Sequence, residues 1–128
     1  MPGVQGKGGG LVANSIRLVI GDIPPSLNVY TRMHWRKRSA LQKRWNTLVW
    51  AACQGREIRT FDRAKVTIIY YFRTSIRHDP DNYSGKVILD GLRKAGVLTD
   101  DSFSNVTIHP VAAYDPAHPR TEIEVEAV

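Results

Sequence analysis

Hydrophobic and polar residues follow strand or helix patterns in six segments of the chain. β-Branched and partly alternating runs predict four strands, at residues 15–20, 64–72, 105–114 and 121–128. Apolar positions at helical spacing predict two helices, at about residues 39–53 and 82–94. The order β-α-β-α-β-β predicts an α+β fold, in which two helices pack on one face of a small mixed β-sheet.

The apolar density of the strands and their breaking residues predict where each strand lies. The run at 64–72 is the most apolar and is expected at the centre of the sheet. Pro110 has no N–H to donate, so its strand is expected at an edge or with a bulge. Strict alternation in the last strand directs Ile123 and Val125 inward. A single turn separates the last two strands, so they are expected to form an antiparallel hairpin.

The second predicted helix has one apolar face and recognisable end signals. The apolar face consists of Val87, Ile88, Gly91, Leu92 and Ala95. Leu89 falls near the opposite, polar face, which points to a subunit contact. Asp79 or Asp81 is placed to cap the N-terminus of this helix, and Gly96 to end it. Residues 27–30, which follow two prolines, are expected to be extended.

Length and composition restrict the class of protein. The chain has 128 residues; residues 1–14 are expected to be a flexible tail and residues 15–128 a single domain. No apolar run approaches the roughly 20 residues of a membrane helix, so no membrane association is expected. A single cysteine, Cys53, excludes an internal disulfide and fits a reducing, cytoplasmic compartment.

Charge is divided unevenly along the chain. Residues 1–78 hold 14 Lys and Arg against 3 Asp and Glu, a balance of +11, whereas residues 79–128 hold 4 against 9, a balance of −5. Such a division suits an enzyme that holds phosphate with one part and cuts it with metal bound to the other. Solvated surface charge is the alternative.

Cations gather before and within the first predicted helix, and we expect them to bind DNA. The predicted DNA-binding residues are Arg32, Arg36, Lys37, Arg38, Lys43, Arg44, Asn28 and Arg77. For Asn28, a backbone hydrogen bond is favoured over a DNA contact. Trp35 and Trp50 are expected in the core or an interface, with base stacking as the less favoured alternative.

The acidic residues gather around the second predicted helix. Asp79 and Asp81 precede it, Lys86 lies near its start, and Asp100 and Asp101 follow it. Crowded carboxylates repel one another and usually persist where they share a cation. These four are expected to bind Mg²⁺, with Mn²⁺ as an alternative, and no small-molecule cofactor is expected. Mg²⁺ lowers the pKa of a bound water, and Lys86 can stabilise the charge that develops during phosphodiester hydrolysis.

Other site chemistries fit this stretch less well. A calcium EF-hand needs different residues where Tyr83, Ser84 and Asp90 stand. One cysteine and four scattered histidines give no zinc-ligand spacing. Walker, Rossmann and nucleophile-elbow motifs are absent.

Structural roles stay open for each of these charged residues. Lys86 can pair with Asp90 four residues along the helix. Asp79 can act as a helix cap, and Asp100-Asp101 can form a polar turn.

The same residues carry a resemblance to the RusA family of Holliday junction resolvases. The matching pattern is Asp79-x-Asp81-Asn82, Lys86, Asp90-x-Leu92, Gly96-Val97 and Asp100-Asp101. The segment at 23–28, Ile-Pro-Pro-Ser-Leu-Asn, resembles that family's proline-and-asparagine segment after the first strand. The resemblance extends over residues 16–128.

This resemblance implies a homodimeric, Mg²⁺-dependent crossover junction endodeoxyribonuclease. Such an enzyme resolves four-way DNA junctions by symmetric phosphodiester hydrolysis in recombination and repair. It would be a bacterial or phage-encoded protein acting on nucleoid DNA. Carried over by position, Asp79, Asp81 and Asp101 match the catalytic carboxylates and Lys86 the catalytic lysine. Asp100 is a less favoured candidate than Asp101, or a group that supports the ligands without binding the metal.

Lys86 departs from the family pattern by one residue. Four residues separate Asp81 from Lys86, where the family has three. If the whole segment were helical, the extra residue would rotate the lysine by about 100°. A looser first turn at Gly85 would absorb that rotation.

Two alternatives stay open. A helix of about 13 residues is about 20 Å long, so Asp101 must return that distance to join Asp81. Asp101 can instead be supplied by the other subunit of a two-fold dimer.

The alternative to a nuclease is a catalytically detuned module that binds branched DNA without cutting it.

Overall fold

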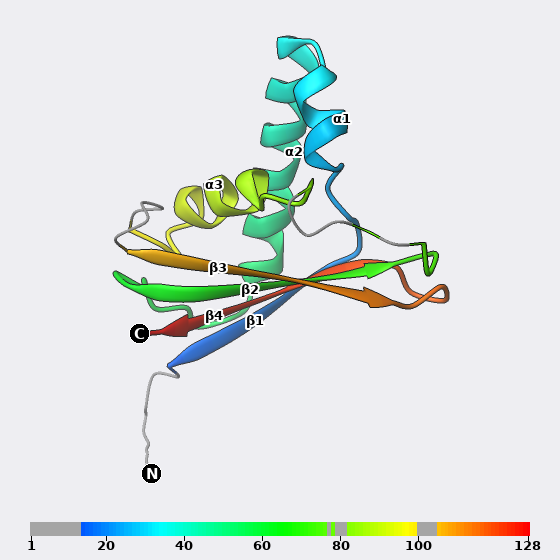
Figure 1. Cartoon of the computed structure of the whole chain (residues 1–128). Coiled ribbons are helices and arrows are strands. Elements are labelled where there is room, and N and C mark those ends of the chain that lie inside the picture. Colours follow the sequence, from blue (N-terminus) through cyan, green and yellow to red (C-terminus); the bar gives the residue numbers. More distant parts are fainter. Residues whose placement is uncertain (1–13, 77, 79–81, 100–104) are drawn as a thin grey trace.

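The computed structural model describes residues 14–76, 78, 82–99 and 105–128. These residues form a four-stranded sheet with three helices (Figure 1). The elements are β1 (Ser15–Ile20), α1 (Leu27–Arg32), α2 (Trp35–Cys53), β2 (Ala64–Phe72), α3 (Lys86–Lys94), β3 (Val106–Tyr114) and β4 (Arg120–Ala127). The α+β class with a mixed sheet is confirmed. The expected N-terminal tail lies outside the described residues, except for Asn14.

The strand order is β1-β4-β2-β3, with β3 parallel to β2 and β4 antiparallel to both of its neighbours. The predicted hairpin of the last two strands is therefore wrong. Helix α3 crosses from the end of β2 to the start of β3, and a crossover of this kind returns the chain parallel to the strand it left. Strand β4 then inserts between β1 and β2. The central position of β2 and the edge position of Pro110 in β3 are confirmed.

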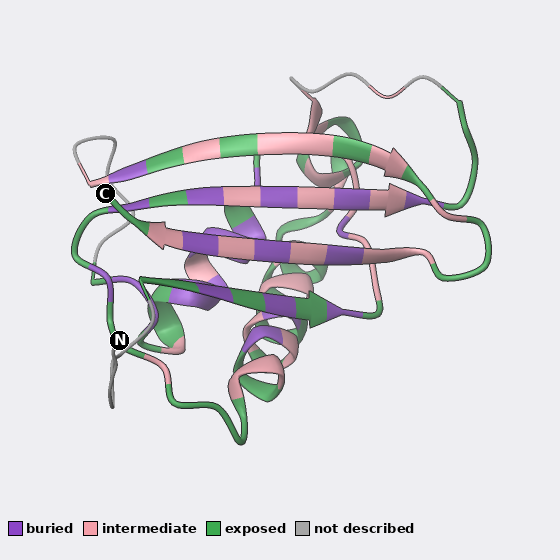
Figure 2. Cartoon of the chain, turned by 90° about the horizontal axis from the view of Figure 1, so that it is seen from below, coloured by how far each residue is buried: buried purple, intermediate pink, exposed green. Residues whose placement is uncertain are grey.

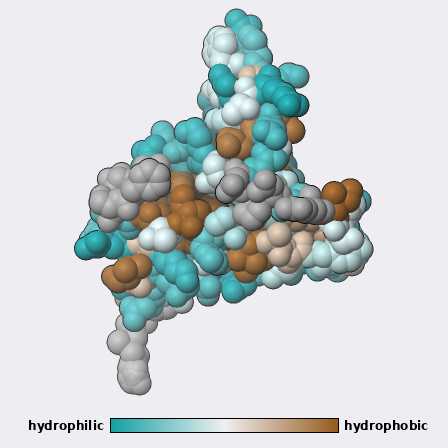
Figure 3. Space-filling model, viewed as in Figure 1, coloured by the Kyte–Doolittle hydropathy of each residue, from teal (hydrophilic) through white to brown (hydrophobic). Residues whose placement is uncertain are grey.

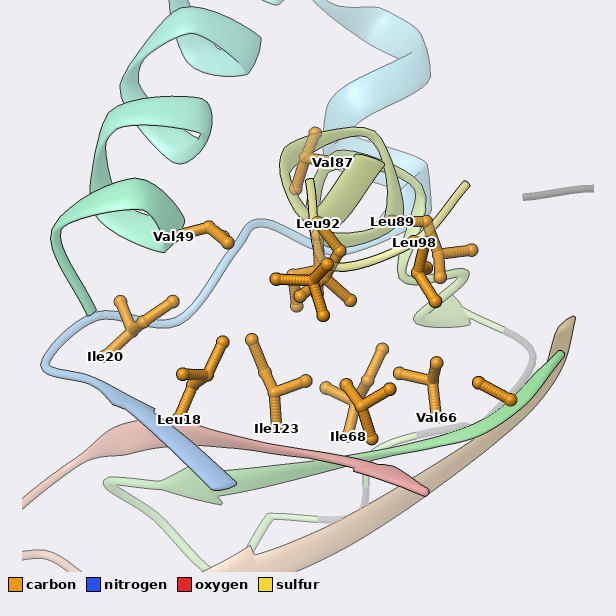
Figure 4. Close-up of a cluster of buried hydrophobic side chains, with 14 of the residues drawn as sticks. Leu18, Ile20, Val49, Val66, Ile68, Val87, Leu89, Leu92, Leu98 and Ile123 are labelled. Carbon is orange, nitrogen blue, oxygen red and sulfur yellow. The ribbon is translucent and has the colours of Figure 1, made fainter. Parts of the chain in front are cut away.

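All three helices lie on one face of the sheet, and the other face is uncovered (Figures 1 and 2). Buried residues, which face the helices, alternate along the strands with more exposed residues on the uncovered face, because successive side chains point to opposite faces of the sheet. Ile123 and Val125 are fully buried beneath the helices, as predicted. The close-up in Figure 4 shows Val49 of α2 and Leu92 of α3 above a row of strand side chains that includes Leu18 and Ile123.

Helix α3 is buried on two sides, by the sheet and by α2. Leu89 is only 7% exposed and belongs to the core, so the predicted subunit contact through Leu89 is wrong. Gly91 explains how closely the helices approach: a Cβ there would lie 2.9 Å from Cγ2 of Val49. Two packed sides widen the buried surface of α3 beyond the single stripe expected from its sequence.

Residues 27–30 are helical, which corrects the prediction of an extended segment. They belong to α1, whose N-cap Ser26 accepts a hydrogen bond from the N–H of Val29. Helix α2 begins at Trp35, four residues earlier than predicted, where His34 Nδ1 accepts from the N–H of Arg36. The prolines thus precede a helix start, where a missing N–H costs little.

Helix α1 and the first half of α2 stand away from the sheet, and we call residues 27–44 the helical arm (Figure 1). No residue of the helical arm is buried. In α2, Trp45 and Val49 are fully buried, while residues such as Leu41 and Leu48 are partly buried against the core. The arm therefore presents most of its side chains to solvent.

Helix α3 begins at Lys86, four residues later than predicted, and its N-cap is Gly85 in the left-handed conformation with φ 72°. The prediction that Asp79 or Asp81 caps α3 is therefore wrong. A Cβ on Gly85 would lie 2.7 Å from Cδ1 of Ile68, which is fully buried. Both the positive φ and this contact require glycine.

Replacing Gly85 by alanine is expected to lower the free energy of unfolding by about 3 kcal/mol, from left-handed strain and overpacking together. Gly55 is a matched control, because it has φ 74° but a Cβ on it would meet nothing within 4 Å. Gly55→Ala should cost about 1 kcal/mol, the strain alone. Urea unfolding of the two variants measures the difference, and equal losses would contradict the contact with Ile68.

Candidate nucleic-acid and metal site

The predicted metal ligands Asp79, Asp81, Asp100 and Asp101, together with Arg77, lie outside the described residues. In the part of the chain that is described, no group of three or more His, Cys, Asp or Glu side chains could hold a metal ion. The structure does describe the residues that flank the carboxylates on both sides.

His78 and Asn82 flank the first pair of carboxylates, and both are held by contacts. The His78 ring stacks on Phe72, the last residue of β2, with a centroid separation of 3.6 Å. Oδ1 of Asn82 accepts a hydrogen bond of 2.9 Å from the backbone N–H of Asn28 in α1. The described residues on either side of the first carboxylates in the sequence are thus held at the end of β2 and at the base of the helical arm.

Two tyrosines pack beneath this segment. The rings of Tyr70 and Tyr83 lie 4.9 Å apart. Burial raises the pKa of both phenols above their usual value. Both are therefore neutral at physiological pH, and their ring contacts assign them to packing.

A small pocket separates α1 from the start of α3. Its lining includes Pro24 and Leu27 on one side and Gly85 and Lys86 on the other, with Tyr70 at its floor. Its volume of about 20 Å³ accommodates about one water molecule. This pocket is therefore too small for a ligand larger than water.

Lys86 is the first residue of α3, and its side chain is 58% exposed. Its Nζ lies 3.7 Å from Oδ2 of Asp90, so the ion pair expected as an alternative role is present. Residues 83–85 are not helical and Gly85 is left-handed. The 100° rotation that a fully helical segment would impose on Lys86 therefore does not apply.

Gln42 fixes the helical arm to the start of α3. Its Nε2 donates to the carbonyl oxygen of Val87 at 2.9 Å and to Oδ1 of Asn46 at 2.8 Å. Sequence reasoning missed Gln42, and it named Asn82 only as part of the family pattern, without its bond to Asn28. A single amide carries no periodic signal, and only the approach of distant segments reveals its role.

The second pair of carboxylates is flanked by residues at the other end of β2. The N–H of Thr99 donates to the carbonyl oxygen of Phe61 at 3.2 Å, and the carbonyl oxygen of Asn105 accepts from Ala64 at 2.9 Å. Ala64 and Phe72 are the two ends of β2, about 26 Å apart at 3.3 Å per residue.

The predicted DNA-binding residues lie mostly on the helical arm and are mostly exposed. Arg32, Arg36, Lys37 and Lys43 are exposed, and Arg38 is half-buried with its guanidinium 6.0 Å from the Tyr30 ring. Arg44 differs from the others, because its Nη2 forms a 2.6 Å ion pair with Asp22. The backbone N–H of Asn28 donates to Oδ1 of Asn82, a bond that does not involve the Asn28 side chain, so the favoured backbone role of that side chain stays a prediction.

Positive charge on the helical arm has little local compensation. Residues 23–56 contain no Asp or Glu. The surface of the arm is predominantly hydrophilic in Figure 3. A surface of this charge attracts a polyanion such as DNA, and binding releases counterions from the polyanion.

The uncovered face of the sheet has a different character, because several of its charges are paired with one another. Glu122 accepts hydrogen bonds from Arg17 and Arg120. Burial alone would raise the pKa of Glu122, but the bonds from the two arginines lower it. Arg120 also binds Asp115 at 2.8 Å and lies over the Tyr71 ring at 3.8 Å. Mutual neutralisation makes this face a weaker attractor of DNA than the helical arm.

The tryptophans are distributed differently from the prediction. Trp35 is 60% exposed and Trp50 is 55% exposed, so neither lies in the core, and the expected alternative, an interface with another subunit, stays a prediction. Trp45 is the tryptophan that fills the core, at 1% exposure. Helix α2 extends beyond the sheet, and only the turns that lie over the sheet can bury their aromatic residues.

Comparisons with known proteins add no family assignment. Neither a scan against protein-family models nor a search of curated proteins found a match to this sequence. Among the described residues, no helix is both long enough and apolar enough to cross a membrane.

Proposed function

We propose that this chain is a metal-dependent endonuclease that cuts four-way DNA junctions, as its resemblance to the RusA family implies. The observation that carries the proposal is the attachment of the basic helical arm to the acidic stretch. Asn28 bonds to Asn82 and Gln42 bonds to Val87, so the arm is fixed on both sides of the predicted catalytic lysine. A DNA backbone held by the arm would pass beside Lys86.

The proposed roles follow from the charge of each group. Asp79, Asp81 and Asp101 would hold Mg²⁺ or Mn²⁺, with Asp100 as an adjacent ligand; carboxylate oxygens are the ligands these ions prefer. The bound ion supplies an activated water and offsets phosphate charge. The exposed ammonium of Lys86 would stabilise the charge that develops on the phosphate oxygens.

A homodimer completes the proposal. Two strands must be cut symmetrically at a four-way junction, and a two-fold dimer presents two identical sites in that relation. The proposed enzyme would act in the cytoplasm, on bacterial or phage DNA.

A nicking assay tests this proposal. A synthetic four-way junction and a linear duplex of matched sequence are incubated with the protein in Mg²⁺ or EDTA, beside an Asp79→Asn variant. We expect paired cuts in the junction only, which require Mg²⁺ and disappear in the variant while junction binding persists. Cutting that survives in EDTA or in Asp79→Asn would reject the proposed site.

A DNA-binding module without nuclease activity is the second candidate. One observation favours it: the ion pair with Asp90 gives Lys86 a structural role that needs no catalysis. Tight junction binding with no cuts in either Mg²⁺ or Mn²⁺ would establish this alternative.

A further inference from the structure

An exposed tryptophan stands at the end of the helical arm that is farthest from the sheet. Trp35 is the first residue of α2, and 60% of its surface is exposed. Its ring lies 5.6 Å from the His34 ring, measured between centroids, and the Arg36 guanidinium lies 5.3 Å from its centre. These two neighbours restrict the indole, while most of it stays open to solvent.

The surroundings of Trp35 are cationic. Arg32, Arg36 and Lys37 are exposed within three residues of it, and no carboxylate occurs between residues 23 and 56. An aromatic platform inside a basic patch is the arrangement with which proteins bind unpaired nucleotides: the ring stacks on a base and the cations bind its phosphates.

We propose that Trp35 is a base-stacking site, which receives a nucleobase exposed where DNA strands branch. A regular duplex keeps its bases stacked inside, whereas a branch point exposes bases at low cost. The neighbouring Arg36 and Lys37 bind the flanking phosphates. The site thereby distinguishes branched DNA from duplex, which phosphate contacts alone do not do.

The distance between Trp35 and Lys86 determines how many nucleotides separate the stacked base from the phosphate that is cut. This estimate rests on the proposed function. Gln42 is level with the start of α3, through its bond to Val87. Trp35 precedes Gln42 by seven residues, which is about 10 Å along a helix. At about 3.4 Å per nucleotide, the stacked base lies about three nucleotides from the phosphate beside Lys86.

Trp50 provides a matched control on the same helix. It is 55% exposed, close to the value for Trp35. It follows Trp35 by 15 residues, and residues 45–55 carry no charged side chain. Loss of an exposed indole is therefore common to both variants. Trp50 shares a surface pocket with Lys94 alone among the cations, whereas Arg32, Arg36 and Lys37 are all exposed within three residues of Trp35.

Binding measurements in EDTA test the inference without involving the metal site. Trp35→Ala is expected to weaken binding to a four-way junction by about tenfold to a hundredfold, the range for one aromatic–base stack. Binding to linear duplex and the salt dependence should not change, and Trp35→Phe should restore most of the affinity. Trp50→Ala should bind both DNAs as the parent does. Arg36→Ala should weaken binding to both and reduce the salt slope by about one.

A fluorescent base reports the stack directly. With 2-aminopurine at the branch point, about three nucleotides from the phosphate expected beside Lys86, the parent and Trp50→Ala should quench its fluorescence and Trp35→Ala should not. Undiminished junction binding by Trp35→Ala, or an equal loss in Trp50→Ala, overturns the stacking inference even if the parent cuts junctions. A parent that binds junctions through Trp35 but never cuts them overturns the nuclease proposal alone.

Discussion

Lys86→Met is expected to slow junction cutting by about a hundredfold to a thousandfold, the usual effect of removing one group that stabilises transition-state charge. Junction affinity in EDTA should change little, because the helical arm supplies the phosphate contacts. The side chain is more than half exposed, so its removal leaves the core intact. Single-turnover rates and binding constants, measured on the same junction, separate the two effects.

Asp90→Asn is the control for Lys86. It removes the partner that holds the ammonium at 3.7 Å and leaves the lysine in place. The loss of helix stability should be only a few tenths of a kcal/mol, and cutting should persist. If Asp90→Asn slows cutting as strongly as Lys86→Met does, the ion pair itself matters and the lysine has no independent role.

Mixing two inactive variants, Asp79→Asn and Asp101→Asn, is expected to restore cutting to about a quarter of the parental level. The flanking residues motivate this expectation: Thr99 and Asn105 are bonded at the Ala64 end of β2, whereas His78 stacks on Phe72 at the other end. If Asp101 is supplied across the two-fold axis, each heterodimer regains one complete site. Half of the dimers in a random mixture are heterodimers, and each has one of its two sites intact.

The products of the mixture provide a sharper readout than its rate. A heterodimer with one complete site should nick one strand of each junction and make no paired cuts. Asp79→Asn mixed with Asp81→Asn is the control, since both residues belong to the same short segment and cannot complement each other. If neither mixture recovers activity after subunit exchange, Asp101 belongs to the same chain as Asp79.

Local patterns predicted the faces of the strands well. Alternation in β4 identified Ile123 and Val125 as buried, because side-chain direction in a strand depends only on position. Pro110 identified β3 as an edge strand, because its nitrogen cannot join a second ladder. Such properties arise within one segment, so the sequence of that segment suffices.

Pairing between strands was not predictable in the same way. β3 and β4 are neighbours in sequence, yet β4 pairs with β1 and β2. The pairing depends on where α3 returns the chain and on which apolar faces meet, and no single segment carries that information. At residues 27–30 a distant residue likewise contributes, because Asn82 accepts a hydrogen bond from the backbone N–H of Asn28 in α1.

The candidate site shows the same division. The sequence by itself determined the basic cluster, the acidic stretch and the lysine between them, since these are properties of composition and spacing. The tertiary structure alone decided that the cations stand on a projecting arm, that Trp35 is exposed while Trp45 is buried, and that Gly85 adopts a left-handed turn. Exposure and backbone strain depend on which segments pack over a residue, and packing is fixed only when the whole chain has folded.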